Sequence, residues 1–133
     1  MPVKKAKGDK AKCDELYSLI IRSEGQCLRC GARCECPQYP KKHIRGCPLT
    51  TSHIVGRRYS ATRTLELNSQ CLCFSCHYYF ENWPKEFSRW ITKTIGIDNY
   101  EELKRKAETV TKVDWTAERE RLQKVWDDIL TNI

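Results

Sequence analysis

The stretch Leu67–His77, with the sequence LNSQCLCFSCH, decides the fold of this 133-residue chain. It spans the end of a predicted two-stranded hairpin over residues 49–73, which are rich in Thr, Ile, Val and Leu and are interrupted by a Gly-Arg-Arg turn. A helix is expected to begin near Phe74 and to end before Pro84, because proline disfavours a helical residue before it. Cys73 and Cys76 therefore sit where the strand gives way to the helix, and His77 lies in the helix.

A second Cys-x-x-Cys pair, Cys27 and Cys30, lies upstream of the hairpin. A thiolate pair at this spacing can bind one tetrahedral Zn²⁺, and two such pairs complete a Cys₄ site. Free structural thiols are the alternative. Because a closed Cys₄ site leaves no position for substrate, we expect this zinc to be structural and to tie the N-terminal segment to the helix after the hairpin.

Five of the nine cysteines remain. Three of them lie close enough in sequence to a histidine to form a second, Cys₃His zinc site: Cys34, Cys36, His43 and Cys47. The alternatives are loop thiols, or substitute partners for the first metal. Cys13, on a predicted helix, and Cys71, on a predicted strand, are expected to be buried small apolar residues.

The composition favours an intracellular metalloprotein. The cysteine count is odd, the first residues lack the apolar run of a secretory signal, and no stretch approaches the roughly 20 apolar residues that span a bilayer. We therefore expect a soluble cytoplasmic protein without membrane contact. The formal net charge is +7, and residues 1–63 hold 14 of the 24 Lys and Arg but 5 of the 17 Asp and Glu. A basic half suggests a face for nucleic acid, although solubility and a basic tail explain the charge as well.

The fold class is predicted to be α+β, with helices on both sides of the hairpin. Residues 1–11 are expected to form a flexible basic arm, residues 12–96 a zinc-bound domain that begins with a helix over 12–23, and residues 97–133 a helical extension packed on the same domain. Helices in the extension are expected to be capped by Asp98 and Asp114, with Val110 on the apolar stripe of the first.

Three polar residues complete the pattern. His53 ends the first predicted strand, Asn68 follows fifteen residues later on the return strand, and His77 comes nine residues after that. Together with the cysteine pairs, residues 27–82 resemble the HNH (His-Me finger) endonucleases, whose segment N-x-Q-x-L-C-x-x-C-H matches Asn68–His77. Residues 83–110 are also similar to the tail of phage-encoded HNH proteins.

The resemblance implies a ββα-metal core and a metal-dependent DNA endonuclease or nickase. His53 would be the general base that deprotonates water, His77 a metal ligand, and Asn68 would hold the hairpin loop and orient His53, or reach the metal itself. The arginines between the strands, Arg57, Arg58 and Arg63, are candidates to clamp phosphates of double-stranded DNA.

One position departs from the family. Many members carry an acidic residue or histidine before the general base as a second metal ligand, and here that residue is Ser52. Glu81 lies one helical turn after His77 and is the expected replacement. One histidine and one carboxylate would leave an open site suited to Mg²⁺ or Mn²⁺ with several waters.

The rival hypothesis is a non-catalytic zinc-ribbon module that binds nucleic acid or bridges proteins in an assembly. It explains the cysteines and the basic half, but not His53, Asn68 and His77 together, and Ser52 is the feature that favours it. If the chain is phage-encoded, it would act in the host cytoplasm, and packaging or recombination proteins are candidate partners.

Overall fold

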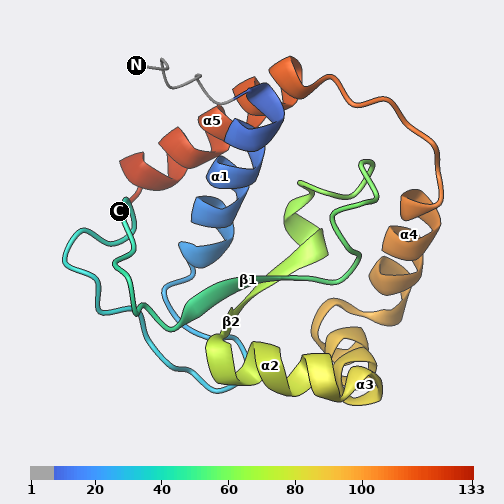
Figure 1. Ribbon diagram of the computed structural model, residues 1–133, viewed down its shortest axis with the longest axis horizontal. Coiled ribbons are helices and arrows are strands. Elements are labelled where there is room, and N and C mark those ends of the chain that lie inside the picture. Colours follow the sequence, from blue (N-terminus) through green and yellow to red (C-terminus); the bar gives the residue numbers. More distant parts are fainter. Residues whose placement is uncertain (1–7) are drawn as a thin grey trace, which may run out of the picture.

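The computed structural model describes residues 8–133, over which the chain forms five α-helices and one two-stranded antiparallel sheet (Figure 1). The α+β class expected from the sequence is confirmed. Most of the predicted basic arm over residues 1–11 lies outside the described residues, since these begin at Gly8. The first helix begins at Asp9 rather than at Lys12, so the last three residues assigned to the arm belong to the helix.

The sheet pairs β1 (Leu49–His53) with β2 (Ser69–Cys73), and its register runs from Leu49 opposite Cys73 to His53 opposite Ser69. This is the predicted hairpin with a long connection. The connection ends in a short 3₁₀ turn, η1 (Glu66–Asn68). All five residues of β2 are buried, so the strand runs through the interior. The antiparallel register brings the end of β1 next to the start of β2, and both lie close to the site described below.

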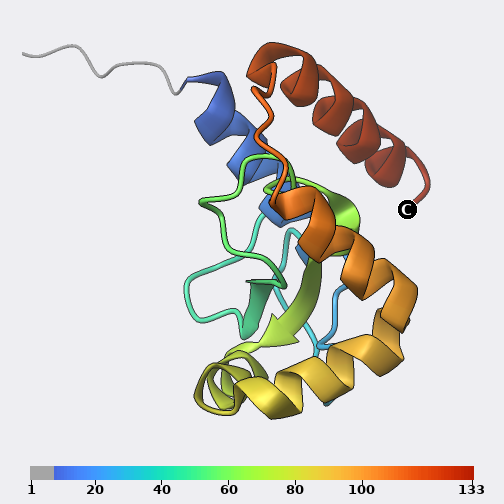
Figure 2. The same ribbon diagram turned by 90° about the vertical axis from the view of Figure 1, so that its right-hand side faces the viewer.

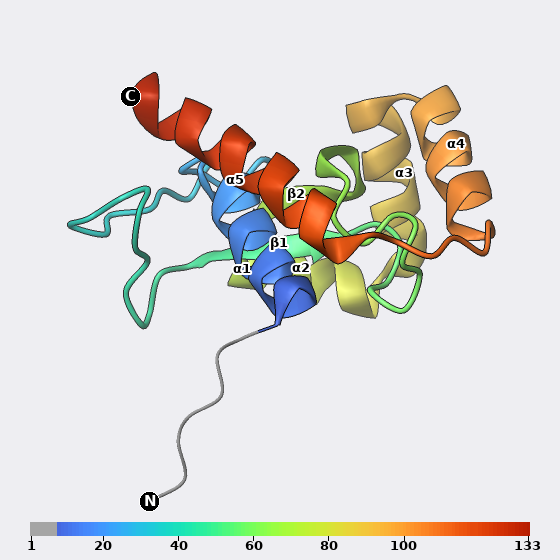
Figure 3. The same ribbon diagram turned by 90° about the horizontal axis from the view of Figure 1, so that it is seen from above.

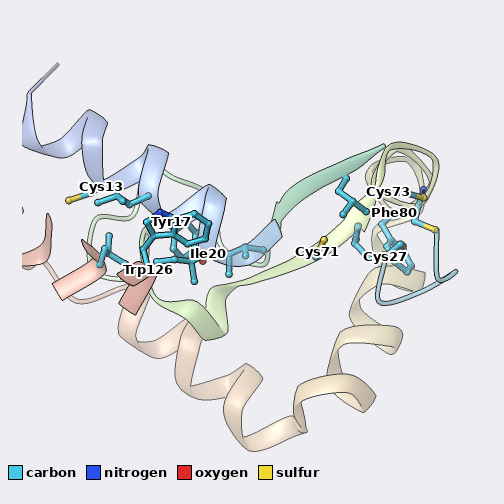
Figure 4. Close-up of a cluster of buried hydrophobic side chains, with 14 residues drawn as sticks. Cys13, Tyr17, Ile20, Cys27, Cys71, Cys73, Phe80 and Trp126 are labelled. Atoms are coloured by element: carbon cyan, nitrogen blue, oxygen red, sulfur yellow. Dashed lines mark hydrogen bonds between the residues drawn. The ribbon is translucent and has the colours of Figure 1, made fainter. Parts of the chain in front are cut away.

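Helix α1 (Asp9–Arg22) contacts both strands of the sheet and packs along α5 (Trp115–Thr131) (Figures 1 and 3). Asp114 caps α5 as expected, because its Oδ1 accepts hydrogen bonds from the amides of Thr116 and Ala117, both at 3.1 Å. Cys13, Tyr17, Ile20 and Trp126 gather between the helices (Figure 4). The C-terminal helix is thus joined to the first helix by a shared apolar core.

Helices α2 (Phe74–Asn82), α3 (Pro84–Ile95) and α4 (Ile97–Ala107) follow the sheet. In Figure 2 the α1–α5 pair lies at one end of the molecule and α2 and α3 at the other, with α4 between them. The predicted break before Pro84 is confirmed, since Trp83 leaves the helical conformation. Rings of Phe80, Phe87 and Trp90 lie 5.2–6.3 Å apart between centroids and join α2 to α3.

Two predictions for α4 are wrong. Its N-cap is Gly96, at φ 88°, so Asp98 lies inside the first turn and does not cap the helix. The chain reverses at a positive φ that glycine adopts without strain, which starts the helix two residues earlier than a cap at Asp98 would. The helix ends at Ala107, and Val110 is fully exposed rather than on an apolar stripe. Among residues 8–133, no helix has the length and apolar content needed to cross a membrane.

We predict that Leu122→Ala destabilises the protein by about 2–5 kcal/mol, because Leu122 is fully buried between α5 and α1 and its removal leaves a cavity. Urea unfolding followed by circular dichroism measures the change. Leu67→Ala makes the same chemical change at a side chain that is 41% exposed, and it should cost far less. Equal losses from the two variants would mean that α5 does not depend on this core.

Candidate functional site

The two Cys-x-x-Cys pairs meet at the junction of β2 and α2. Their four sulfur atoms, from Cys27, Cys30, Cys73 and Cys76, all lie within 4.8 Å of one another. The amides of Cys30 and Cys76 each point at the sulfur three residues earlier, with N···Sγ distances of 3.5 Å. Four sulfurs at this spacing could hold a metal such as zinc in a tetrahedral site.

The ionisation of these thiols fits a bound cation. Burial alone would raise the pKa of Cys27, but backbone amide hydrogen bonds, led by that of Cys30, bring it down to about 6. Burial raises the pKa of Cys76 to about 12. Four thiolates this close together, three of them on buried residues, repel one another without compensating charge, and a divalent cation bound to all four would supply it.

Arg29, between Cys27 and Cys30, takes part in this site, although no sequence motif predicts a role for it. Its Nη1 donates to the sulfur of Cys76 at 3.4 Å, and its guanidinium lies 4.4 Å from the ring centre of Tyr79. Arg29 adds positive charge beside the sulfur atoms. It also connects the Cys27–Cys30 segment to α2. In the sequence, only the position of Arg29 between Cys27 and Cys30 points to this contact.

The second group of cysteines also converges. Ligand atoms of Cys34, Cys36, His43 and Cys47 lie within 4.8 Å of one another. The Nδ1 atom of His43 lies 3.5 Å from the sulfur of Cys34 and 3.4 Å from that of Cys47. Burial lowers the pKa of His43, which favours the neutral imidazole that metals bind. This group could hold a second metal ion. Cys13 and Cys71 are buried outside both groups, as expected.

We expect the purified protein to carry two metal ions per chain, and native mass spectrometry counts them. Replacing two ligands of the second group, Cys34→Ser with His43→Ala, should leave one ion. Replacing Cys30 and Cys73 by Ser should also remove one ion and should unfold the junction of β2 and α2. A wild-type protein that binds a single ion, or none, would contradict the assignment of two sites.

His53, the last residue of β1, faces a cleft of about 480 Å³. The cleft is lined by α1, β1, the loop after β1, and α2: Asp14, Tyr17, Ser18, Thr51, His53, Gly56, Arg57, His77 and Glu81. The ring of Tyr17 lies 5.6 Å from that of His53, centre to centre. Burial, reinforced by the charge of Arg57, lowers the pKa of His53, so its imidazole is neutral at neutral pH and can accept a proton.

Asn68 fixes the chain just after His53. Its Oδ1 accepts from the amide of Val55 at 2.9 Å, and its Nδ2 donates to the carbonyl of Val55 at 3.0 Å. Its backbone carbonyl accepts from the amide of Ile54 at 2.7 Å. Asn68 is fully buried, so these bonds are shielded from water. Both polar atoms of the side chain are occupied by Val55, and Asn68 holds the loop rather than lining the cleft.

His77 enters the cleft from α2, and Thr50 sets its orientation. The Thr50 hydroxyl donates its one proton to the Leu72 carbonyl at 2.8 Å, so at 2.9 Å its oxygen accepts from His77 Nδ1. The other ring nitrogen, Nε2, lies 3.4 Å from Oε1 of Glu81, and in the neutral imidazole this nitrogen carries the lone pair. A lone pair and a carboxylate oxygen at this separation could serve as two ligands of a divalent cation.

Ser52 lies beside this pair. It is buried and lines a small hollow of about 160 Å³ together with His53, His77 and Glu81. Its hydroxyl is neutral and is a weak ligand for a hard divalent cation. The carboxylate in the lining of this hollow is that of Glu81, which comes from α2 rather than from β1.

The three predicted phosphate-binding arginines occupy three different settings. Arg57 lines the cleft. Arg58 stacks on the ring of Tyr59, 4.6 Å from its centre, and does not line the cleft. Arg63 forms a two-pronged ion pair with Asp14, with N···O distances of 2.9 and 2.6 Å, and its Nη1 donates to the carbonyl of Arg57 at 2.9 Å. Arg63 therefore positions Arg57, and its own guanidinium is already occupied.

Helix α1 supplies one wall of the cleft, through residues that sequence analysis did not select. Tyr17 and Ser18 follow Asp14 by three and four residues, so all three lie on the same side of the helix. Tyr17 donates to the carbonyl of Leu65 at 2.6 Å and contacts the hydroxyl of Ser69 at 2.7 Å, which ties the wall to η1 and β2. No local motif marks these residues, because their role depends on how α1 packs.

We predict that Asn68→Ala destabilises the protein by about 2–3 kcal/mol, since it removes two buried hydrogen bonds and leaves both backbone groups of Val55 unpaired. Urea unfolding measures the loss. Asn82→Ala, which removes an exposed bond to the Tyr78 carbonyl, serves as the control and should cost less than about 0.5 kcal/mol. A loss at Asn68 as small as that of the control would contradict its role in the loop.

Comparison of the chain with protein-family models, with curated proteins and with solved structures finds no match.

Proposed function

We propose that the chain is a metal-dependent endonuclease of the HNH type, which hydrolyses phosphodiester bonds of double-stranded DNA. The observation that carries the proposal is the meeting of His53 and His77 in one cleft, with Asn68 holding the loop between them. The two histidines come from β1 and α2, and Asn68 comes from the turn into β2. Two strands followed by a helix, with one of the three residues on or next to each segment, support the ββα unit proposed from the resemblance.

In this proposal His53 is the general base. Its neutral imidazole takes a proton from a water molecule, whose oxygen attacks phosphorus while the bond from phosphorus to the 3′-oxygen breaks. The products are a 5′-phosphate and a 3′-hydroxyl, the latter protonated by solvent. Tyr17 packs against the imidazole and limits its movement. Arg57, held by the contact of Arg63 with its carbonyl, faces the cleft and binds a phosphate oxygen.

His77 and Glu81 are the proposed ligands of a catalytic Mg²⁺ or Mn²⁺. Their donor set fits such a cation, because one neutral imidazole nitrogen and one carboxylate oxygen lie 3.4 Å apart at the edge of an open cleft. When bound, the cation stabilises the negative charge of the transition state and of the departing oxygen. Thr50 keeps Nε2 of His77 directed at this position by holding Nδ1.

We propose structural Zn²⁺ in both cysteine groups. Thiolates and imidazole prefer zinc to Mg²⁺ or Mn²⁺, so the chain separates its structural metals from its catalytic one by ligand chemistry. Four protein ligands close each site and leave no position for substrate. The first zinc anchors the start of α2, the helix that carries His77 and Glu81.

The test is incubation of the purified protein with supercoiled plasmid in the presence of EDTA, Mg²⁺ or Mn²⁺. We expect relaxed or linear product with either metal and none with EDTA. His53→Ala should lower the rate by about 100-fold or more, because a positioned general base contributes roughly that factor. Binding of the variant to DNA should be unchanged, since His53 acts in the proton transfer.

Glu81→Gln tests the proposed catalytic metal, and Glu101→Gln on the exposed surface of α4 is its matched control. The Glu81 variant should need a higher Mg²⁺ concentration for half-maximal cleavage, and the Glu101 variant should match the wild type. If DNA binds but stays intact under every metal, the chain is a non-catalytic zinc module, and Ser52 marks a site that has lost its chemistry.

A further inference from the structure

The loop 33–47 holds the second cysteine group and is built around it. An isolated bridge from Gln26 to Arg33 and a hydrogen bond from the Tyr39 hydroxyl to the Ser23 carbonyl connect it to the preceding segment, and it otherwise consists of turns and irregular backbone. Of its residues, Cys36 and Pro40 alone are buried. A loop this long without a core is held by its ligand cluster, so its conformation depends on the bound metal.

The outer surface of this basic loop is strongly positive. Arg33, Lys41, Lys42 and Arg45 are exposed, and Glu35 is the one acidic residue between 33 and 47. Within residues 8–133, none of these four cations forms an ion pair with a carboxylate. Arginines elsewhere do, for example Arg63 with Asp14 and Arg121 with Glu66. Grouped cations without partners repel one another until a polyanion neutralises them.

The basic loop leads directly into the strand that carries His53. Six residue steps separate Cys47 from His53, and at about 3.3 Å per residue they span roughly 20 Å. In Figure 3 the loop projects at one end of the molecule, opposite α3 and α4. Phosphates of one DNA strand follow at about 3.4 Å along the helix axis, so ~20 Å corresponds to about six of them. One duplex can therefore reach both the cleft and the loop.

We propose that the basic loop is a metal-folded finger that grips the phosphate backbone of duplex DNA about half a helical turn from the bond held in the cleft. The inference rests on the proposed function and adds a second contact surface to it. Lysine residues are depleted at the centres of protein–protein interfaces. The two lysines of the loop therefore favour a phosphate backbone over a protein as the partner.

The first test replaces the charges and keeps every metal ligand: Lys41→Gln, Lys42→Gln and Arg45→Gln together. Fluorescence anisotropy with a labelled 30-base-pair duplex, in a His53→Ala background that prevents cleavage, gives Kd across a salt series. We expect Kd to rise about tenfold or more at ~100 mM salt, and the slope of log K against log salt to fall by about 2–3, since each phosphate contact contributes roughly 0.9.

The matched control removes the same charge elsewhere, with Lys85→Gln, Lys93→Gln and Lys124→Gln on the exposed surfaces of α3 and α5. It should leave Kd within about twofold of the parent. Equal weakening by the two triple variants would overturn the proposal, because net charge rather than the loop would then govern binding.

A second test removes the metal. Cys34→Ser with His43→Ala should raise Kd as much as the charge variant does, and combining the two sets should add nothing further. Binding as tight as that of the parent after loss of the ion would overturn the metal-folded finger. A wild-type chain that neither binds nor cleaves duplex DNA would instead overturn the proposed nuclease, whereas a cleaving wild type with an unaffected charge variant would overturn the finger alone.

Discussion

The tetracysteine cluster at the junction of β2 and α2 is the constraint on which the rest of the structure depends. It joins the loop after α1 to the end of β2, next to the bond between the amide of Leu28 and the carbonyl of Cys71 at 2.9 Å. His77 follows Cys76 directly, and Glu81 lies one turn further along α2. Any shift of this junction would therefore move both proposed ligands of the catalytic cation relative to His53.

The cleft has two further supports of different kinds. Asn68 fixes the backbone beyond His53 with a closed set of buried hydrogen bonds, and α1 supplies a wall that is itself held by α5. The ion pair of Arg63 with Asp14 connects that wall to the loop bearing Arg57. The proposed base, metal ligands and phosphate contact thus come from separate elements, and packing rather than local sequence brings them together.

The parts that the sequence predicts well are those fixed by local spacing. The hairpin, the start of α2 and the two cysteine groups follow from residue order, because strand pairing and Cys-x-x-Cys geometry act over a few residues. Proline at position 84 ends α2 for the same local reason. The proximity of Glu81 to His77 is also predictable from the sequence, since residues one helical turn apart share a face of the helix.

Features that depend on tertiary packing cannot be predicted from the sequence alone. The contribution of α1 to the cleft and the Arg63–Asp14 pair join residues nearly fifty positions apart, and no single-sequence pattern reports them. Arg58 and Arg63 resemble phosphate ligands in the sequence, yet one stacks on Tyr59 and the other is paired. The start of α4 was misplaced because a backbone reversal at Gly96, rather than the capping chemistry of Asp98, sets it.

The most direct measurement of the central claim is anomalous X-ray diffraction from crystals of the protein soaked in Mn²⁺, recorded at the zinc and manganese edges. The account predicts zinc peaks within both cysteine groups and a manganese peak between Nε2 of His77 and the carboxylate of Glu81, beside His53. Manganese bound elsewhere, or absent while zinc fills both groups, would contradict a catalytic metal in this cleft.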